Sequence, residues 1–356
     1  MRGISSIGLG LIASLGCSVT YANTMRVATY DAGLSRKGPG LTLDALRKND
    51  PQILAALRVV AKVSPDVILL TGTDFDAGEA LLKMLTSRLV EMGADYPYQF
   101  TTMPNSGLPT GFDIDGNGRR FEARDAQGFG YFTGDNGMAL LSKIPIEAVE
   151  DFSLFLWKDL PDSLIGGASL SPEAATVQRL ASTNHWDVAL KLPSGDRVHL
   201  FAFSATPPVF DGPEDRNGRR NHDETAFWMA YLDGELPRKP PAAPFIILGQ
   251  VNLDPADGEG RKEALTALLS DPRVQDPRPN NTGQHNTEQT KTNGDAMDTA
   301  EFGGEAGNLR VDYVLPSRDF TVTGSGVYWP ALPDPMAQTV LEASRHRLVY
   351  VDVELR

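Results

Sequence analysis

The apolar run Val67-Ile68-Leu69-Leu70 constrains the fold more than any other part of this sequence. Four adjacent apolar residues between polar segments are typical of a strand that is buried on both faces. The residues before the run predict a helix, because Asp50 and Pro51 suit an N-cap and a first turn, and the apolar positions within 53–60 fall on one helical face. An earlier β-rich run at 25–30 predicts a first strand. The chain therefore opens with strand, helix and strand.

The rest of the chain alternates less regularly. We predict strands at 137–142, 186–192, 198–203 and 245–248, and helices at 77–92, 221–232 and 261–269. In the second of these helices, Asn221 and Glu224 are expected to form a capping box. Strands with interspersed helices favour two packed sheets with helices outside. Because we find neither a repeat nor a compositional break, 23–356 is expected to be one domain.

The first 22 residues have the features of a signal peptide. Met1-Arg2-Gly3 precedes an apolar stretch over 4–15, and Thr20-Tyr21-Ala22 suits signal-peptidase cleavage after Ala22. The apolar stretch is too short for a convincing membrane span. We therefore expect an exported chain, periplasmic or extracellular, with no transmembrane segment in its mature part. A lipoprotein anchored through Cys17 is the alternative.

The charge of the chain limits its partners. It carries 46 acidic and 33 basic residues, a formal net charge of -13. Such a field repels polyanions unless basic residues gather locally. Bulk nucleic acid is therefore not expected as a partner, and no protein partner is indicated.

Five segments, taken in order, resemble the endonuclease/exonuclease/phosphatase family, and especially its exported bacterial branch. They span nearly the whole mature chain, and most of them lie at predicted strand ends: Val27-Ala28-Thr29-Tyr30-Asp31, Pro65-Asp66-Val67-Ile68-Leu69-Leu70, Gly249-Gln250-Val251-Asn252-Leu253-Asp254-Pro255, Arg310-Val311-Asp312-Tyr313-Val314-Leu315-Pro316-Ser317 and Ser344-Arg345-His346-Arg347-Leu348. The resemblance implies a four-layer α/β sandwich of two packed, mainly antiparallel sheets flanked by helices. The active site of such proteins lies where strand ends converge.

The resemblance also implies Mg²⁺-dependent hydrolysis of phosphoesters. Hard Mg²⁺ prefers carboxylate and water oxygens, and it neutralises the charge that develops on the phosphate. Asn252, Asp312 and His346 match central positions of the family. By this resemblance, His346 paired with Asp312 would stabilise the reacting phosphate, and Asn252 would help to position the attacking water.

Other central positions depart from the family pattern. Where the family has Asn, Glu, His, Asp and Asp, this chain has Asp31, Gly72, Ser204, Gln250 and Arg345. Loss of the Glu removes an oxygen ligand, and Arg345 puts a fixed cation where a divalent ion should sit. We hypothesise that an Asp31–Arg345 ion pair fills the vacated metal site, which needs no cofactor.

In the alternative hypothesis, the family's metal ion is retained at a shifted position. Asp31, Asp74 and Asp76 would then recruit Mg²⁺ or Mn²⁺ in a geometry that differs from the family's. This alternative keeps the chain an enzyme.

A second metal is suggested by the segment Asp113-Ile114-Asp115-Gly116-Asn117-Gly118. It has the start of a calcium loop, in which Asp113, Asp115 and Asn117 would supply oxygens to a structural Ca²⁺. The twelfth position holds Arg124, where a bidentate Glu is expected. The competing interpretation is a turn whose side chains accept hydrogen bonds from its own backbone.

Three further residues are ligand-binding candidates. Arg219 and Arg220 lie in a segment that precedes a predicted helix, where guanidinium groups suit phosphate oxygens. His185 resembles a family position near the cleft. The competing interpretations are solvated charges for the arginines and a packed, hydrogen-bonded ring for His185.

Together these patterns favour an exported pseudoenzyme of the family, with lost or impaired phosphoesterase activity, that binds a small phosphorylated or other anionic ligand in the old cleft. One alternative is an active secreted metal-dependent phosphodiesterase or phosphatase with a relocated metal. Another is a calcium-stabilised protein that binds a partner. Fold alone does not choose a substrate.

Overall fold

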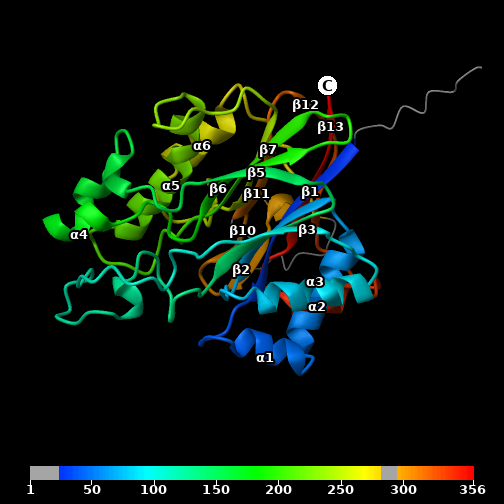
Figure 1. The fold of residues 1–356 in the computed structure, drawn as a ribbon, viewed down its shortest axis with the longest axis horizontal. Helices are drawn as coiled ribbons and strands as arrows, with labels where there is room; N and C mark the ends of the chain where they lie inside the picture. The colour runs from blue at the N-terminus through cyan, green and yellow to red at the C-terminus, as the bar shows by residue number, and fades with distance from the viewer. Residues whose placement is uncertain (1–23, 282–294) are drawn as a thin grey trace, which may run out of the picture.

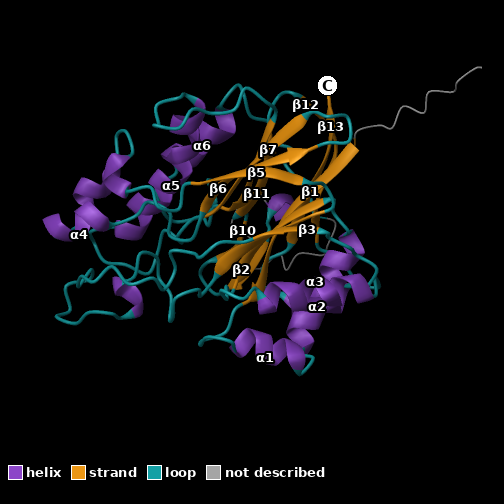
Figure 2. Ribbon diagram, in the orientation of Figure 1, coloured by secondary structure: helices purple, strands orange, loops and turns teal. Residues whose placement is uncertain are grey.

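Two β-sheets lie against each other in the middle of the molecule, and helices cover their outer sides (Figures 1 and 2). Figure 1 is coloured along the chain, and Figure 2 is coloured by secondary structure. This computed structural model describes residues 24–281 and 295–356. The predicted signal peptide at 1–22, with Cys17, lies outside the described residues and stays a prediction. None of the described helices combines the length and apolar character that crossing a membrane requires.

The first sheet has six strands. In sheet order they are β12 (Phe320–Tyr328), β13 (Leu348–Leu355), β1 (Thr24–Leu34), β2 (Val67–Thr73), β4 (Gly137–Ser142) and β3 (Tyr98–Phe100). Only β1 and β2 pair in parallel, with Val27 opposite Val67, and the other pairs are antiparallel. The strand–helix–strand prediction is confirmed, since the predicted helix lies between these two strands, preceded by a second, short helix at 41–47.

The second sheet has five strands. In sheet order they are β11 (Asp312–Pro316), β8 (Phe245–Gln250), β7 (Arg197–Ser204), β6 (His185–Lys191) and β5 (Ile146–Asp151). Again one pair, β7 with β8, is parallel. A small sheet joins β9 (Ala300–Gly303) to β10 (Gly307–Leu309). The predicted pair of packed, mainly antiparallel sheets is confirmed.

The helices divide between the two outer sides. They are α1 (Leu41–Arg47), α2 (Pro51–Val63), α3 (Ala80–Glu91), α4 (Pro172–Val177), α5 (Arg216–Leu232), α6 (Glu263–Ser270) and α7 (Ala337–Ala343). α2 contacts β1, and α1, α3 and α7 pack around α2. On the far side, Trp228 of α5 stacks on Phe201 of β7 with ring centroids 5.2 Å apart. Helices therefore flank the sheets on both sides.

The two sheets share one apolar core. Every residue of β2 is buried, and its run from Val67 to Leu70 lies in the same apolar cluster as Leu200 of β7 and Leu248 of β8. A strand buried on both faces needs apolar side chains at successive positions, which is what this run supplies. The buried core therefore fixes how one sheet faces the other.

The predicted capping box is wrong. α5 begins at Arg216, so Asn221 lies inside the helix. Its amide nitrogen donates to the backbone oxygens of Thr206 and Val251, each at 2.7 Å. Glu224 is fully buried and accepts hydrogen bonds from the backbone N–H groups of Ser182 and Thr206. These side chains hold loops in place. Their hydrogen-bond partners are set by tertiary contacts and not by spacing along the sequence.

Replacing the N-cap residue of α2 tests the first predicted helix. The Asp50 carboxylate accepts from the N–H groups of Gln52 at 3.0 Å and Ile53 at 3.2 Å. We expect Asp50→Ala to lower the free energy of unfolding by about 1 kcal/mol, because an N-cap acceptor is lost. Urea unfolding measures the change. Asp50→Asn keeps an acceptor and should stay closer to the wild type, so an equal loss in both variants would contradict the cap.

Candidate functional site

The ends of several strands bring most of the family positions together. β1 contacts β8 and β11, and β11 contacts β13. The residues concerned lie within β1 and β2, at the ends of β7 and β8, at the start of β11 and just before β13: Asp31, Gly72, Ser204, Gln250, Asp312 and His346. Backbone register sets two of these neighbours directly, since Gln250 is opposite Asp312 and beside Ser204.

His346 and Asp312 form a buried pair. The Nδ1 atom of His346 donates to Oδ2 of Asp312 at 2.8 Å. Thr299 donates its hydroxyl to the same oxygen at 2.9 Å. Asp312 is fully buried, and its other oxygen has no hydrogen-bond partner among the described residues. The carboxylate therefore fixes the orientation of the ring and which ring nitrogen faces the neighbouring strand.

Gln250 lies at the centre of a hydrogen-bonded network. Its Nε2 atom donates to Oδ2 of Asp31 at 2.9 Å, and its Oε1 atom accepts from the hydroxyl of Ser204 at 3.1 Å. The same nitrogen is 3.4 Å from Nε2 of His346. Three of the five substituted family positions are therefore bonded to one another. We call Ser204, Gln250, Asp31, His346 and Asp312 the central network.

The charge of His346 follows from its neighbours. Burial by itself lowers the pKa of the ring, but the carboxylates of Asp312 and Asp31 outweigh this and raise the pKa to about 9. At neutral pH the ring is therefore an imidazolium. Nε2 of His346 lies 3.9 Å from Oδ2 of Asp31, within ion-pair range. Because both nitrogens then carry hydrogens, the 3.4 Å approach of Gln250 is not a hydrogen bond.

Gly72 leaves the space that Asp31 fills. Its backbone is left-handed, with φ of 62°, and a Cβ placed on it would lie 2.5 Å from Oδ1 of Asp31. That separation is shorter than real Cβ contacts allow. No side chain fits at position 72 while Asp31 keeps its place. The two substitutions therefore depend on each other.

Comparison with known proteins identifies the family. The model of the endonuclease/exonuclease/phosphatase family matches residues 34–346. This chain belongs to the endonuclease/exonuclease/phosphatase family. No curated protein matches it.

Solved structures of family members share the fold. An endonuclease/exonuclease/phosphatase from Beutenbergia cavernae is 16% identical, with a TM-score of 0.56 over 93% of this chain and 72% of the other. A family protein from Leptotrichia buccalis is 14% identical, with a TM-score of 0.53 over 93% and 100%. One from Bacteroides thetaiotaomicron is 14% identical, with a TM-score of 0.51 over 94% and 98%. At such identities the likeness shows the fold alone.

The central network does not fit the divalent ion that the family generally uses. Asp31 is the one carboxylate of the central network that lies next to position 72. Both oxygens of Asp31 already accept hydrogen bonds, from Gln250 and from the N–H of Gly33. The imidazolium of His346 lies beside it. Hard cations need several oxygen ligands and are repelled by a neighbouring cation. The described residues here do not offer such a ligand set.

The hypothesised Asp31–Arg345 ion pair is wrong. Within 24–281 and 295–356, Asp31 has its salt-bridge contact with His346, and Arg345 is exposed and forms no ion pair. Ser344, in extended conformation, donates its hydroxyl to the backbone oxygen of Asp31 at 2.7 Å. Successive side chains of an extended chain point to opposite sides. Ser344 and His346 therefore face the network, and Arg345 lies on the other side.

The predicted shifted metal set of Asp31, Asp74 and Asp76 does not form either. Asp74 accepts from the hydroxyl of Thr42 and from the N–H of Arg36 at 3.2 Å. Asp76 accepts from the N–H groups of Ala80 and Leu81 at the start of α3, each at 2.9 Å. In the part of the chain that the structure describes, these three acids do not group closely enough to share an ion. Local backbone donors take up their oxygens instead.

Asn252 lies where a loop leaves β8. Its φ is 59°, a left-handed conformation that Asn tolerates better than most residues. Its amide nitrogen donates to the backbone oxygen of Ala205 at 2.7 Å, which ties the ends of β7 and β8 together. In the structure, Asn252 therefore connects two strand ends beside the central network.

The ligand-binding prediction for His185 is wrong. Its side chain is 1% exposed and packs between Phe203, Phe227 and Trp228. Nε2 donates to the backbone oxygen of Glu224 at 3.1 Å, and burial lowers the pKa of the ring to about 4. A neutral ring inside the aromatic core cannot reach a ligand.

The arginine predictions are also corrected. Arg220 is buried and donates to the backbone oxygens of Leu180, Arg179 and Ala181 at 2.8 to 3.0 Å. Burial lowers its pKa to about 10, so it stays charged at neutral pH. Arg219 donates to the backbone oxygen of Glu214 at 3.0 Å. Arg220 therefore holds the segment 179–181, and Arg219, which is half-buried, bonds the segment just before α5.

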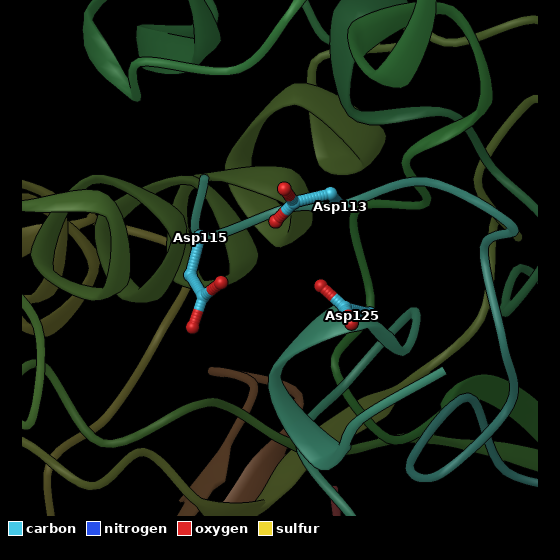
Figure 3. Close-up of side chains that lie close together, drawn as sticks. All are labelled: Asp113, Asp115 and Asp125. Atoms are coloured by element: carbon cyan, nitrogen blue, oxygen red, sulfur yellow. The ribbon is translucent and has the colours of Figure 1, made fainter. Parts of the chain in front are cut away.

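The predicted calcium loop brings Asp113 and Asp115 together with Asp125. Asp113, Asp115 and Asp125 lie close together, with ligand oxygens within 4.8 Å of one another (Figure 3). Asn117 turns its amide nitrogen to Glu122 at 2.7 Å. Asp113 accepts three backbone N–H groups of its own loop, as the competing turn interpretation expects. Calcium binding stays a prediction, with Asp125 in place of Asn117.

Some residues of the site gave no usable sequence signal. Thr299 reaches Asp312 from thirteen positions away, and Asp125 is one position beyond the expected calcium ligand. A shift of the loop pattern by one residue would have found Asp125. Local spacing does not predict the role of Thr299, because its hydrogen bond to Asp312 depends on the tertiary fold.

The charge of His346 predicts a pH-dependent stability. Its folded pKa of about 9 exceeds the ordinary value of 6.5, so its stabilisation is complete below about pH 6.5 and is lost as pH rises through 9. We expect the free energy of unfolding to fall by about 1 to 3 kcal/mol over this range. Urea unfolding at several pH values measures it. His346→Gln should flatten the slope, whereas His222→Gln should keep it; equal slopes in all three proteins would contradict the assignment.

Proposed function

We propose that this protein is an exported pseudoenzyme of the endonuclease/exonuclease/phosphatase family, in which metal-dependent phosphoester hydrolysis is lost or strongly impaired. The observation that carries the proposal is the central network. Gln250 bonds Asp31 and Ser204, and the His346 imidazolium lies beside them, at the strand ends where the family's chemistry is expected.

The position that the resemblance assigns to the base holds an amide in this network. A general base must accept a proton at working pH. Gln250 replaces the family's acid with an amide, and His346 is already protonated at neutral pH. Asp31 accepts two hydrogen bonds that hold it in place. The loss of a metal ligand at Gly72 and the loss of a base at Gln250 would therefore both lower hydrolytic activity.

An anionic ligand would need a cation that is free of carboxylates. The His346 imidazolium lies between Asp31 and Asp312, so its field is largely offset. Arg345, next to it in the chain, is exposed and forms no ion pair among the described residues. Arg345 faces away from the network, so a small phosphorylated or other anionic ligand of the old cleft would meet the His346 imidazolium there and not Arg345.

Export rests on the sequence of the first 22 residues. A charged start, an apolar stretch and small residues before the expected cleavage position support removal after Ala22. Expression in a Gram-negative host followed by intact-mass measurement of the periplasmic protein tests this proposal. A mass that retains residues 1–22, or protein confined to the cytoplasm, would contradict it.

The proposed loss of activity has a direct assay. The mature protein is incubated with phosphomonoester and phosphodiester substrates in the presence of Mg²⁺, Mn²⁺ or Ca²⁺. We expect no metal-dependent turnover, because the ligand set and the base are absent. Metal-dependent turnover that His346→Ala abolishes would overturn the proposal and restore the active phosphoesterase as the better hypothesis.

A restored variant tests the reason for the loss. It combines Asp31→Asn, Gly72→Glu, Ser204→His, Gln250→Asp and Arg345→Asp, and we expect it to gain metal-dependent turnover. Gly72→Glu alone should stay inactive, because Gln250 and Ser204 would still stand where the family has an acid and a histidine. The matched control adds His346→Ala to the restored variant and should be inactive. A fully folded restored variant without turnover would show that the inactivity has another cause.

A further inference from the structure

A pocket lies on the outer face of the second sheet. It has a volume of about 520 Å³ and is lined by Tyr231, which is near the end of α5. Ala148 of β5, Ala189 of β6 and His199 of β7 lie side by side there, as paired residues of neighbouring strands. The segment after α5 forms the opposite wall with Pro237 and Pro241. The walls are therefore largely apolar.

A chain of polar groups reaches into this pocket. The hydroxyl of Tyr231 donates to Oδ2 of Asp187 at 2.9 Å, and Nδ1 of His199 donates to Oδ1 at 2.5 Å. Asp187 is 5% exposed, so this carboxylate is buried beneath the pocket. Since a carboxylate only accepts, Nδ1 carries a hydrogen, and Nε2 is the ring nitrogen left to bond a ligand. Among the described residues Nε2 has no hydrogen-bond partner.

Of the two basic side chains that line the pocket, one has a carboxylate partner among the described residues and the other has none. Arg238 pairs with Glu150 at 2.7 Å. Lys239 also lines the pocket, and its Nζ atom donates to the backbone oxygen of Gly234 at 2.6 Å. Within the described residues Lys239 forms no ion pair. It can therefore bind an anionic group, although the chain as a whole carries a net charge of -13.

This pocket is separate from the central network. His199 is five residues from Ser204 along β7, which corresponds to roughly 17 Å in a strand. An odd separation also puts the two side chains on opposite faces of the sheet. Nothing that the central network binds would contact His199, so the two sites can be tested independently.

We propose that this pocket binds a small hydroxy carboxylate with an apolar body. The hydroxyl of the ligand forms a hydrogen bond with Nε2 of His199, its carboxylate pairs with Lys239, and its apolar part lies on Ala148, Val149 and Ala189. Tyr231 is a positioning residue, because it holds Asp187, which in turn orients His199. The proposal does not depend on whether the central network is catalytic.

The test uses three matched probes: 4-hydroxyphenylacetate, phenylacetate, which lacks the hydroxyl, and 4-cresol, which lacks the carboxylate. Binding is followed through the ¹⁵N resonances of the histidine rings of the full-length mature protein. We expect 4-hydroxyphenylacetate to shift Nε2 of His199 with a dissociation constant on the order of 1 mM. Each of the other probes should bind at least about fivefold more weakly, the usual effect of losing one polar contact.

Two variants separate the contacts. Ala148→Trp fills the pocket without changing the polar chain and should abolish the shift, whereas Ala77→Trp in a distant exposed loop should leave it unchanged. Lys239→Ala should weaken 4-hydroxyphenylacetate and leave 4-cresol unaffected. The proposal is overturned if His199 does not respond at about 10 mM probe, if all three probes bind equally, or if Ala148→Trp binds as the wild type does.

Discussion

The packing of the two sheets against each other is the interaction on which the rest of this structure depends. Val67 to Leu70 of β2 lie in one apolar cluster with side chains of β7 and β8. Once the sheets are held face to face, the strand ends meet at one edge of the sandwich. Backbone register then puts Gln250 opposite Asp312 and beside Ser204. The central network is thus a consequence of core packing, since no local segment contains its members.

The substitutions at this edge fit one another. Gly72 leaves the room that the Asp31 carboxylate occupies, and Gln250 supplies a hydrogen to that carboxylate. Ser204, a short side chain, donates to the remaining oxygen of Gln250. Buried polar groups cost free energy unless they are hydrogen-bonded, and these three side chains satisfy one another. At this edge the family scaffold holds a hydrogen-bonded polar network.

Charged residues near α5 show why composition can mislead about function. The segment from Glu214 to Glu224 carries several charges that suggest ligand recognition. In the structure, Arg219 and Arg220 donate to backbone carbonyls, and Glu224 accepts from backbone N–H groups. Long connections leave such backbone groups without partners in secondary structure, and buried ones must be satisfied. The same charges therefore serve to fix loops over the second sheet.

The sequence by itself determined the secondary structure near the core and the family. The apolar run at Val67 to Leu70 and the N-cap at Asp50 act through neighbouring residues, so their patterns are readable in the chain. Only the tertiary structure decided the partners of the polar residues. Asp31 meets Gln250 rather than Arg345, and His199 meets Asp187 across two strands, because such contacts depend on register and on which face a side chain takes. Spacing along one sequence does not contain that information.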